Sequence, residues 1–304
     1  MDYVLKTNAL TKTYKTTKAL DRLTMSVEKG AIYGFVGRNG AGKTTLIRLI
    51  CGLQSPTEGS FTLYGCANTS REIHRARRRM GAVVETPSIY LSMTAEENLK
   101  QQYQILGLPS YDGVGELLAL VQLENTGKKK AKDFSLGMRQ RLGIAVALAG
   151  DPDFLILDEP ANGLDPQGIV EIRELILRLN QERQITVLIS SHILDELSRL
   201  ATHYGFIDGG RMIKEISAAD LKASCRKCLR LTVGDIFSLP AALDRLGLEY
   251  AVRSGTEADV YGAPSVTDLT LALHAAGCEL KSIHEHDESL ESYYMNLVGG
   301  AVDE

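Results

Sequence analysis

A glycine-rich segment has the residue types and the spacing needed to hold phosphate groups. It follows an apolar run and reads Gly37-Arg38-Asn39-Gly40-Ala41-Gly42-Lys43-Thr44, with Thr45 next. Glycines let the backbone curl so that its N–H groups point at phosphate oxygens, and a helix starting at the end of the segment adds its positive dipole end. The Lys43 ammonium suits the terminal phosphates, and the Thr44 hydroxyl suits Mg²⁺. The segment therefore predicts a site for ATP and Mg²⁺, with a structural glycine turn as the alternative.

Two adjacent carboxylates, Asp158 and Glu159, follow the apolar run at residues 154–157. A buried strand holds the residues at its end rigidly, so Asp158 is expected in the magnesium shell. Glu159 is then left to polarise an attacking water as general base. An ordinary acid pair at a strand end is the alternative. Combined with the phosphate loop, the pair predicts nucleotide hydrolysis with Lys43 and Glu159 as catalytic residues.

A third motif lies shortly before the acidic strand and reads Phe134-Ser135-Leu136-Gly137-Met138-Arg139-Gln140-Arg141. With the two motifs above, it resembles the signature sequence of the ABC ATPases. The resemblance implies that Ser135 and Gly137 contact the γ-phosphate held by a second subunit, again at a helix N-terminus. It therefore implies a second ATPase subunit, and a homodimer is expected. Leu136 and Met138 stand where the commonest form of this motif has glycine and glutamine.

Three further positions agree with this resemblance. Tyr14, ahead of the phosphate loop, resembles the aromatic residue that stacks on adenine, and an exposed strand tyrosine is the alternative. Asp165, at the end of the run 161–165, resembles part of the loop that links the two active sites of the dimer. His192, after the apolar run 186–190, resembles the switch histidine that senses the γ-phosphate, which makes it the third catalytic candidate.

Glu85 departs from the family pattern, which usually has a glutamine that ligates magnesium and leads into the contact with the membrane subunit. A glutamate keeps the reach and adds a negative charge, which tightens the metal contact and repels the γ-phosphate unless the metal screens it. Together with the Ser-Leu-Gly-Met signature, Glu85 resembles the ATPase subunits of bacitracin and lantibiotic resistance exporters. This resemblance covers residues 3–216, and it implies export of an antimicrobial peptide or another amphipathic compound.

The elements that must position these motifs alternate between apolar, strand-like runs and helix-length periodic segments, which predicts an α/β ATPase domain over residues 1–216. Strands are expected at residues 31–36, 81–84, 154–157 and 186–190. Helices are expected to begin at Lys43, Ala95, Leu136, Gln167 and His192. Thr94 and Glu97 form a capping-box pattern for the second of these helices.

Residues 217–304 predict a small α+β domain of the ferredoxin-like, split βαβ kind. Strands are expected at 228–233, 249–253, 259–262 and 279–284, and helices at 235–246, 266–276 and 290–298. The resulting order is βαββαβα. The pair Cys225 and Cys228 has the spacing of a zinc or redox motif, but no second pair lies at zinc-ribbon spacing, so a simple linker is favoured.

The composition argues against nucleic acid as a partner, because the formal net charge is -4 and the pI is 5.9. No apolar run approaches the roughly 18 residues of a membrane span. We therefore expect a cytoplasmic chain held at the inner face of the membrane by a separate integral membrane transporter subunit. Five cysteines and no recognisable export signal agree with that compartment.

Two other functions remain open at this point. A soluble ABC ATPase acting on ribosomes or DNA is one, although the chain has one cassette and no sustained heptads. An ion exporter or a sensor complex is the other, and the sequence does not exclude it. The arginines at positions 71, 75, 77, 78 and 79 predict a solvated or partner-facing helix rather than a phosphate contact.

Overall fold

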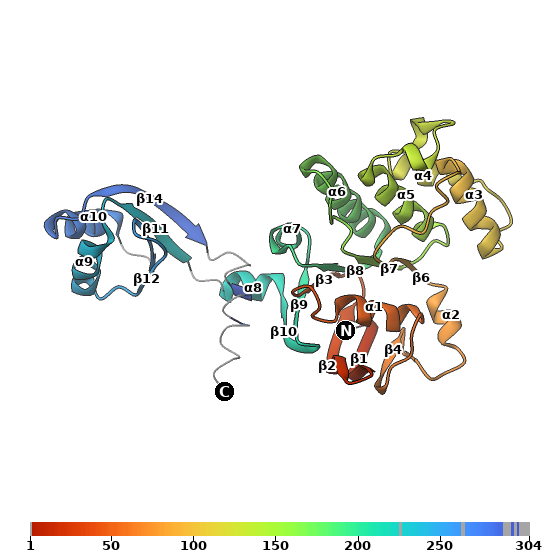
Figure 1. Ribbon diagram of the computed structural model, residues 1–304, viewed down its shortest axis with the longest axis horizontal. Coiled ribbons are helices and arrows are strands. Elements are labelled where there is room, and N and C mark those ends of the chain that lie inside the picture. Colours follow the sequence, from red (N-terminus) through yellow and green to blue (C-terminus); the bar gives the residue numbers. More distant parts are fainter. Residues whose placement is uncertain (1, 225–226, 263–264, 288–292, 295–296, 298–304) are drawn as a thin grey trace. The chain divides into compact units, whose positions relative to one another are not determined.

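The computed structural model describes residues 2–224, 227–262, 265–287, 293–294 and 297 (Figure 1). Its contacts divide the chain into two compact units, Met1–Ala218 and Ala219–Glu304. The division lies two residues after the boundary expected at residue 216. The α/β class and the smaller C-terminal α+β unit are both confirmed.

The first unit contains two sheets. One is antiparallel, in the order β2-β1-β4-β5, with bounds Thr17–Glu28, Tyr3–Tyr14, Glu58–Leu63 and Cys66–Ala67. The other has the order β10-β9-β3-β8-β7-β6, with bounds Arg211–Ser217, His203–Asp208, Ile32–Val36, Thr186–Ser191, Phe154–Asp158 and Met80–Val83. Its strands run parallel except for the edge strand β10. The four strands expected from the apolar runs are present to within a residue or two at their ends.

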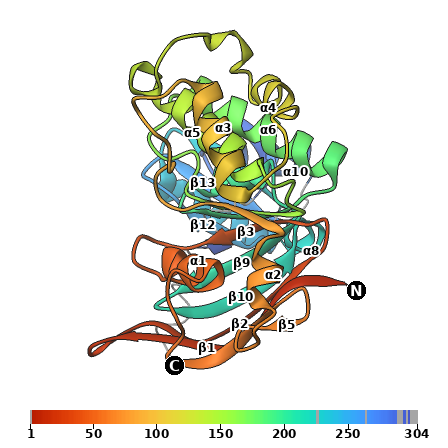
Figure 2. The same ribbon diagram turned by 90° about the vertical axis from the view of Figure 1, so that its right-hand side faces the viewer.

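The central strands β3, β7 and β8 are buried along their whole length. A parallel strand covered on both faces reads as a continuous apolar run, which explains why these strands were recognisable in the sequence. The antiparallel sheet, α1 and one face of the parallel sheet share a core that includes Leu46, Phe61 and Ile156. Helices α5 and α6 lie on the other face (Figures 1 and 2).

The helices of the first unit follow local signals in the sequence. They are α1 Lys43–Cys51, α2 Ile73–Arg77, α3 Ala95–Leu106, α4 Val114–Leu120, α5 Leu136–Leu148, α6 Pro166–Arg183 and α7 Leu194–Ser198, with 3₁₀ turns η1 Glu124–Thr126 and η2 Ala131–Asp133. The predicted capping box of α3 is present, since Thr94 Oγ1 accepts from Glu97 N and Glu97 Oε2 accepts from Thr94 N. Helix α8, Ala218–Ser224, begins at the division between the units.

The predicted helix start at His192 is wrong by two residues, because α7 begins at Leu194. Ser191 Oγ accepts a bond from the Ile193 N–H at 2.9 Å, and Ile193 is extended. This turn leaves His192 outside the helix.

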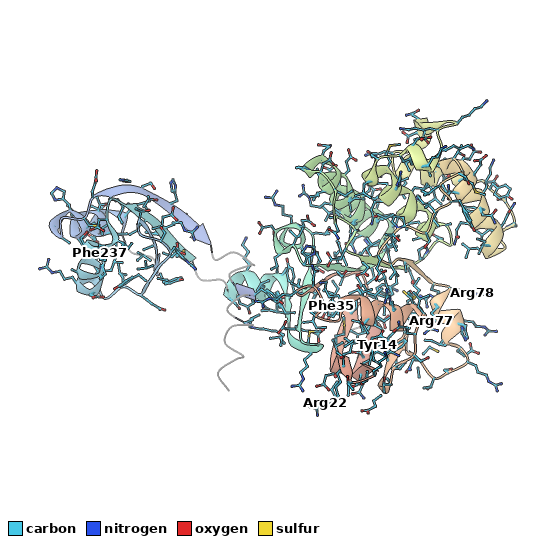
Figure 3. All side chains as sticks on the ribbon, viewed as in Figure 1. Tyr14, Arg22, Phe35, Arg77, Arg78 and Phe237 are labelled. Atoms are coloured by element: carbon cyan, nitrogen blue, oxygen red, sulfur yellow. The ribbon has the colours of Figure 1, made fainter. Side chains whose placement is uncertain are left out.

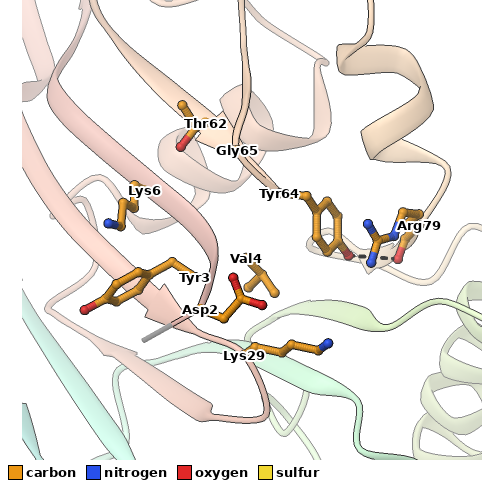
Figure 4. A pocket seen from close by; sticks show the side chains of 9 residues that line it. All are labelled: Asp2, Tyr3, Val4, Lys6, Lys29, Thr62, Tyr64, Gly65 and Arg79. Carbon is orange, nitrogen blue, oxygen red and sulfur yellow. Dashed lines mark hydrogen bonds between the residues drawn. The ribbon is translucent and has the colours of Figure 1, made fainter.

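A polar network ties the amino ends of β6 and β7 to the turn after β4. The Tyr64 hydroxyl donates to the Asp153 carboxylate, and its oxygen also lies 3.1 Å from the Arg79 carbonyl oxygen, a contact drawn in Figure 4. Arg79 lies 3.8 Å from the centroid of the Tyr64 ring and pairs with Asp153. Tyr64 and Arg79 also line a cavity of about 410 Å³. The phosphate loop follows the carboxyl end of β3, whereas this network precedes the amino ends of β6 and β7.

The second unit has the order β11 Lys227–Val233, η3 Ile236–Ser238, α9 Leu239–Leu246, β12 Tyr250–Val252, β13 Glu257–Tyr261, α10 Val266–Ala275 and β14 Leu280–Asp287. Its antiparallel sheet has the strand order β12-β13-β11-β14, the arrangement of a ferredoxin-like, split βαβ unit. The last predicted helix, 290–298, falls mostly outside the described residues, and so does Cys225. Cys228 is buried on β11.

Asp259 is a buried carboxylate on β13, with a side chain 1% exposed. It accepts bonds from Arg230 Nε at 2.7 Å and Arg253 Nε at 2.8 Å. These hydrogen bonds, above all the one from Arg230, lower the pKa of the Asp259 carboxyl. The carboxylate is therefore satisfied by two guanidinium groups that remain partly in solvent.

We predict that Asp259→Asn lowers the stability of the second unit by about 1–3 kcal/mol, because an amide cannot pair with both guanidinium groups. Hydrogen exchange of peptides from this unit would measure the change. Since the pKa of Asp259 is lowered on folding, its contribution is present above the unfolded value of about 3.9. It is lost as the pH falls through the lower folded value, so the wild type and the variant should converge in acid. Asp244→Asn, at an exposed position, is the control. Equal protection in Asp259→Asn and wild type at neutral pH would contradict this role.

Candidate functional site

The phosphate loop requires glycine at Gly42, because of its backbone conformation and a close contact, and at Gly37, because of a close contact alone. Gly42 has φ 110°, and a Cβ atom there would lie 2.5 Å from the Ala19 carbonyl oxygen. A Cβ atom at Gly37 would lie 2.5 Å from the Ile207 carbonyl oxygen. Gly42 is also the N-cap of α1, so the loop leads straight into a helix N-terminus. The local conditions for binding an anion are therefore met.

Lys43 is buried, with 5% of its surface exposed, at the first position of α1. Its Nζ donates to the Gly37 carbonyl at 2.6 Å and to the Arg38 carbonyl at 3.3 Å. The same Nζ lies 3.1 Å from Glu159 Oε1. A buried ammonium needs such partners, and the loop and the acidic strand supply them together.

Asp158 ends β7 with 1% of its surface exposed. Its Oδ1 accepts a bond from Ser190 Oγ at 2.6 Å, whereas its Oδ2 is buried without a hydrogen-bond partner. A buried carboxylate oxygen without a donor suits a hard divalent cation or a water bound to one. The residues present therefore fit Mg²⁺, with Asp158 and the half-buried Thr44 as the expected ligands.

Glu159 has a left-handed backbone, with φ 50°, which is uncommon for a residue other than glycine. Its N–H donates to Ser190 Oγ at 3.0 Å and is 3.2 Å from the Ser190 carbonyl oxygen. Its Oε2 lies 2.8 Å from His192 Nδ1. The strained turn thus aims the carboxylate between Lys43 and His192, as an active-site strand end commonly does.

Ser190 is a site residue that reasoning from the sequence missed. Its hydroxyl donates to Asp158 and accepts from the Glu159 N–H, so one side chain orients both carboxylates. The signal for it was the position of Ser190 at the end of the apolar run 186–190. Recognising it required the register of β7 and β8, in which Asp158 lies directly opposite Ser190.

The remaining residues expected at the nucleotide lie in the loop, in the first turn of α1 or, for Tyr14, at the end of β1. Gly40 has φ 83°, Asn39 is exposed, Ala41 is buried, and Thr45 is half-buried in the first turn of α1. Tyr14, labelled in Figure 3, is 39% exposed at the end of β1, and its hydroxyl donates to Gln54. Lys12 Nζ lies 5.2 Å from the centroid of the Tyr14 ring. Because Tyr14 is partly exposed, its ring is accessible to a flat partner.

Ser135 and Asp165 are N-caps of exposed helix starts. Ser135 Oγ accepts from Met138 N at 3.2 Å at the start of α5, and Asp165 Oδ1 accepts from Gly168 N at 2.9 Å at the start of α6. Gly137 is half-buried, with space beside it up to Leu164. The contacts described for these three residues are local to their helix starts. They are not joined to Lys43, Asp158 and Glu159 within the described part of one chain.

Glu85, expected as a metal ligand, is paired with a basic side chain. Its Oε1 accepts a bond from Arg48 Nη2 at 2.5 Å, and its side chain is 54% exposed. The residue has a left-handed backbone, with φ 59°. The basic side chain on the last turn of α1 competes for this carboxylate, a competition that the spacing of the sequence motifs did not reveal.

The comparisons with known proteins agree with this geometry. The family model described as ABC transporter matches residues 20–162, which include the phosphate loop, the signature motif and both carboxylates. Two curated relatives are 41% and 37% identical to the chain over nearly its whole length. The chain belongs to the ABC transporter family, as an ATP-binding and ATP-hydrolysing subunit.

Two groups of curated relatives carry more specific names. The chain is 41% identical over 303 residues to the bacitracin transport ATP-binding protein BcrA of Bacillus licheniformis, with 99% of each chain covered. It is 42% identical over 212 residues to the lantibiotic transport ATP-binding protein SrtF of Streptococcus pyogenes, covering 70% of this chain and 90% of SrtF.

Solved structures match the ATPase unit. The structure of cbiO1 from Clostridium perfringens, part of the ABC transporter complex cbiONQ, superposes with a TM-score of 0.66 at 27% identity, covering 74% of this chain and 92% of cbiO1. The dimeric structure of MJ0796, a bacterial ABC transporter cassette, gives a TM-score of 0.64 at 26% identity, covering 70% of this chain and 98% of that cassette.

We predict that Ser190→Ala lowers ATP hydrolysis by about 10-fold and raises the Mg²⁺ concentration needed for half-maximal rate, because Asp158 and Glu159 lose their shared positioning group. Steady-state hydrolysis across a Mg²⁺ titration measures both effects. Ser190→Thr keeps the hydroxyl and should recover most of the rate. An unchanged Mg²⁺ dependence in a folded Ser190→Ala protein would remove Ser190 from this role.

Proposed function

We propose that this chain binds Mg²⁺ and ATP in the Gly37–Thr44 loop, hydrolyses the ATP as one half of a homodimer, and energises a separate membrane subunit. The transported compound is an antimicrobial peptide or another amphipathic molecule. The observation that carries the proposal is the cluster of Lys43, Glu159 and His192 beside the phosphate loop. The names of the bacitracin and lantibiotic relatives support the class of compound.

Each residue of this cluster has a distinct chemical task. Lys43 binds the terminal phosphates, and Glu159 accepts a proton from the attacking water. His192, bonded to Glu159 Oε2, orients that carboxylate and senses the γ-phosphate. Thr44 and Asp158 would hold Mg²⁺, which neutralises phosphate charge when it is bound.

The ion pair between Lys43 and Glu159 connects binding to catalysis. The two groups neutralise each other, with Nζ and Oε1 3.1 Å apart. The triphosphate of ATP offers Lys43 a stronger anion, so Glu159 is released to face the attacking water. Glu159 therefore becomes available as a base only when a nucleotide has replaced it at Lys43.

The proposal of a dimer rests on Ser135 and Asp165, which lie outside the cluster around Lys43. Ser135 caps a helix whose N-terminus is exposed, and such a terminus attracts an anion. The proposed homodimer sets this terminus against the γ-phosphate of the second subunit, with Asp165 near the junction of the two sites. Dimeric cassettes among the matched structures support this arrangement.

A groove of about 400 Å³ is the proposed contact for the membrane subunit. It is lined by β6, α5, the end of α3 and the segment after β6, including Leu106, Val146 and Ser88. His74 and Arg77 from α2, and Arg78 directly after it, line the groove and favour an acidic segment of the partner; Arg77 and Arg78 are labelled in Figure 3. Tyr90 and Leu91 are exposed apolar side chains on the segment that leads from Glu85.

The location follows from this partner. No helix in the described part of the chain is both long enough and apolar enough to cross a bilayer. We propose that the chain is cytoplasmic and sits at the inner face of the membrane through its partner. An acidic chain of this kind is a poor ligand for ribosomes or DNA, which leaves the membrane complex as the preferred function.

The length of the relatives favours a bacitracin-type system over a lantibiotic-type one. The match with SrtF covers 212 residues and 90% of that protein, so SrtF has about 236 residues (212/0.90) against 304 here. BcrA is matched over 99% of both chains, so the match includes the second unit. We propose that residues 217–304, which contain the second unit, form an accessory or regulatory domain of the bacitracin-type subunit.

We predict that Glu159→Gln lowers ATP turnover by about 100-fold or more, because the water loses its base. ATP binding should be kept or become tighter, because a neutral glutamine no longer competes with the phosphates for Lys43. Turnover and equilibrium binding of ATP measure the two effects separately. Glu182→Gln, at an exposed position of α6, should behave as the wild type. Near-normal hydrolysis by Glu159→Gln would reject Glu159 as the base.

A tagged wild-type chain is expected to copurify with its membrane protein from the native membrane. We predict that the Arg78→Glu variant copurifies with at least 10-fold less of this protein, because a basic side of the groove becomes acidic. Mass spectrometry of the copurified protein measures the loss. Arg75→Glu changes a basic residue of the neighbouring helix α2 that does not line the groove, and this variant should retain the partner. Full retention by Arg78→Glu would exclude this groove, and ribosomes in place of a membrane protein would overturn the proposed function.

A further inference from the structure

An ion pair connects the far end of α1 to the segment that follows β6. Arg48 Nη2 donates to Glu85 Oε1 at 2.5 Å. Helix α1 begins with the phosphate-binding Lys43, so Arg48 is anchored on the element that starts at the nucleotide site. Glu85 lies two residues after Val83, which pairs with Leu157, the neighbour of Asp158. Both partners are thus tied to the elements that hold the site.

Glu85 brings a charge that this edge of the sheet accommodates poorly. Asp158 and Glu159 already end the neighbouring strand, and Lys43 is paired with Glu159. A third carboxylate near the same strand ends adds to the negative charge that an incoming triphosphate meets. The left-handed backbone of Glu85, with φ 59°, is a conformation that surrounding contacts must maintain.

We propose that Arg48 is a positioning residue that neutralises Glu85 and holds its carboxylate away from the phosphates until Mg²⁺ and ATP are both present. The proposal rests on the proposed nucleotide site. It names a requirement of this chain in particular, because a glutamine at position 85 would carry no charge to neutralise. Arg48 thus compensates the charge of the glutamate at position 85, whereas an uncharged side chain there would need no such partner.

A simpler role for Arg48 is stabilisation of α1, since a cation in the last turn interacts favourably with the helix dipole. That role does not depend on the residue at position 85. The side chains of Arg48 and Glu85 are 35% and 54% exposed, and pairs in such surroundings add little to folding stability. Measurements of ATP binding, with and without Glu85, therefore distinguish the two roles, whereas the melting temperature does not.

A double-mutant cycle tests the pairing through equilibrium binding of ATP, measured once with a chelator and once with Mg²⁺. We expect Arg48→Met to weaken ATP binding without metal by about two- to fivefold, because the Glu85 charge is uncompensated. With Mg²⁺ the loss should shrink, since the metal screens the carboxylate. In the Glu85→Gln background, Arg48→Met should have no effect. The control is Lys100→Met, which removes a similarly exposed ion pair with Glu96 on α3 and should bind ATP as the wild type does.

Equal losses from Arg48→Met in the wild-type and the Glu85→Gln backgrounds would overturn the pairing and leave only the helix-dipole role. Arg48→Lys keeps the charge and should keep wild-type binding, which tests the proposal even if Arg48→Met unfolds. Thermal melting of each variant identifies such unfolding. A wild-type chain that binds no ATP with or without Mg²⁺ would instead contradict the proposed nucleotide site.

Discussion

A buried ammonium group must have partners, and this requirement organises the nucleotide site. Lys43 is 5% exposed, and it is satisfied by loop carbonyls on one side and by Glu159 on the other. The pair joins the phosphate loop after β3 to the acidic end of β7, although the two residues lie 116 positions apart in the chain (159 − 43). In the proposed mechanism, ATP enters by exchanging its phosphates for this internal carboxylate, so the binding of substrate and the release of the base are one event.

Strand order supplies the precision of the site. In the parallel sheet β8 lies between β3 and β7, so the carboxyl ends of these three strands meet at one edge. Ser190 near the end of β8 then reaches Asp158 and the Glu159 backbone together, and His192 follows two residues later. The unusual backbone of Glu159 is maintained by these contacts, which points the carboxylate towards Lys43 rather than into solvent.

Charge balance links the site to its surroundings. Glu159 is matched by Lys43, and Glu85 is matched by Arg48 from the last turn of the same helix. The segment after Glu85 includes Ser88, which lines the groove with a basic side where an acidic partner segment is proposed to dock, and it continues to the exposed Tyr90 and Leu91. A change in the pairing of Glu85 is therefore suited to carry the nucleotide state towards the proposed membrane subunit.

The sequence by itself determined the strands, the phosphate loop and the split βαβ unit, because each depends on local spacing: buried apolar runs, glycines before a helix, and capping residues. Only the tertiary structure decided three features. Ser190 joined the site through the register of β7 and β8, α7 started at Leu194 because Ser191 forms a turn, and Glu85 paired with Arg48 from another element. These outcomes depend on which side chains meet across strands and helices, and such meetings leave no periodic signal along the chain.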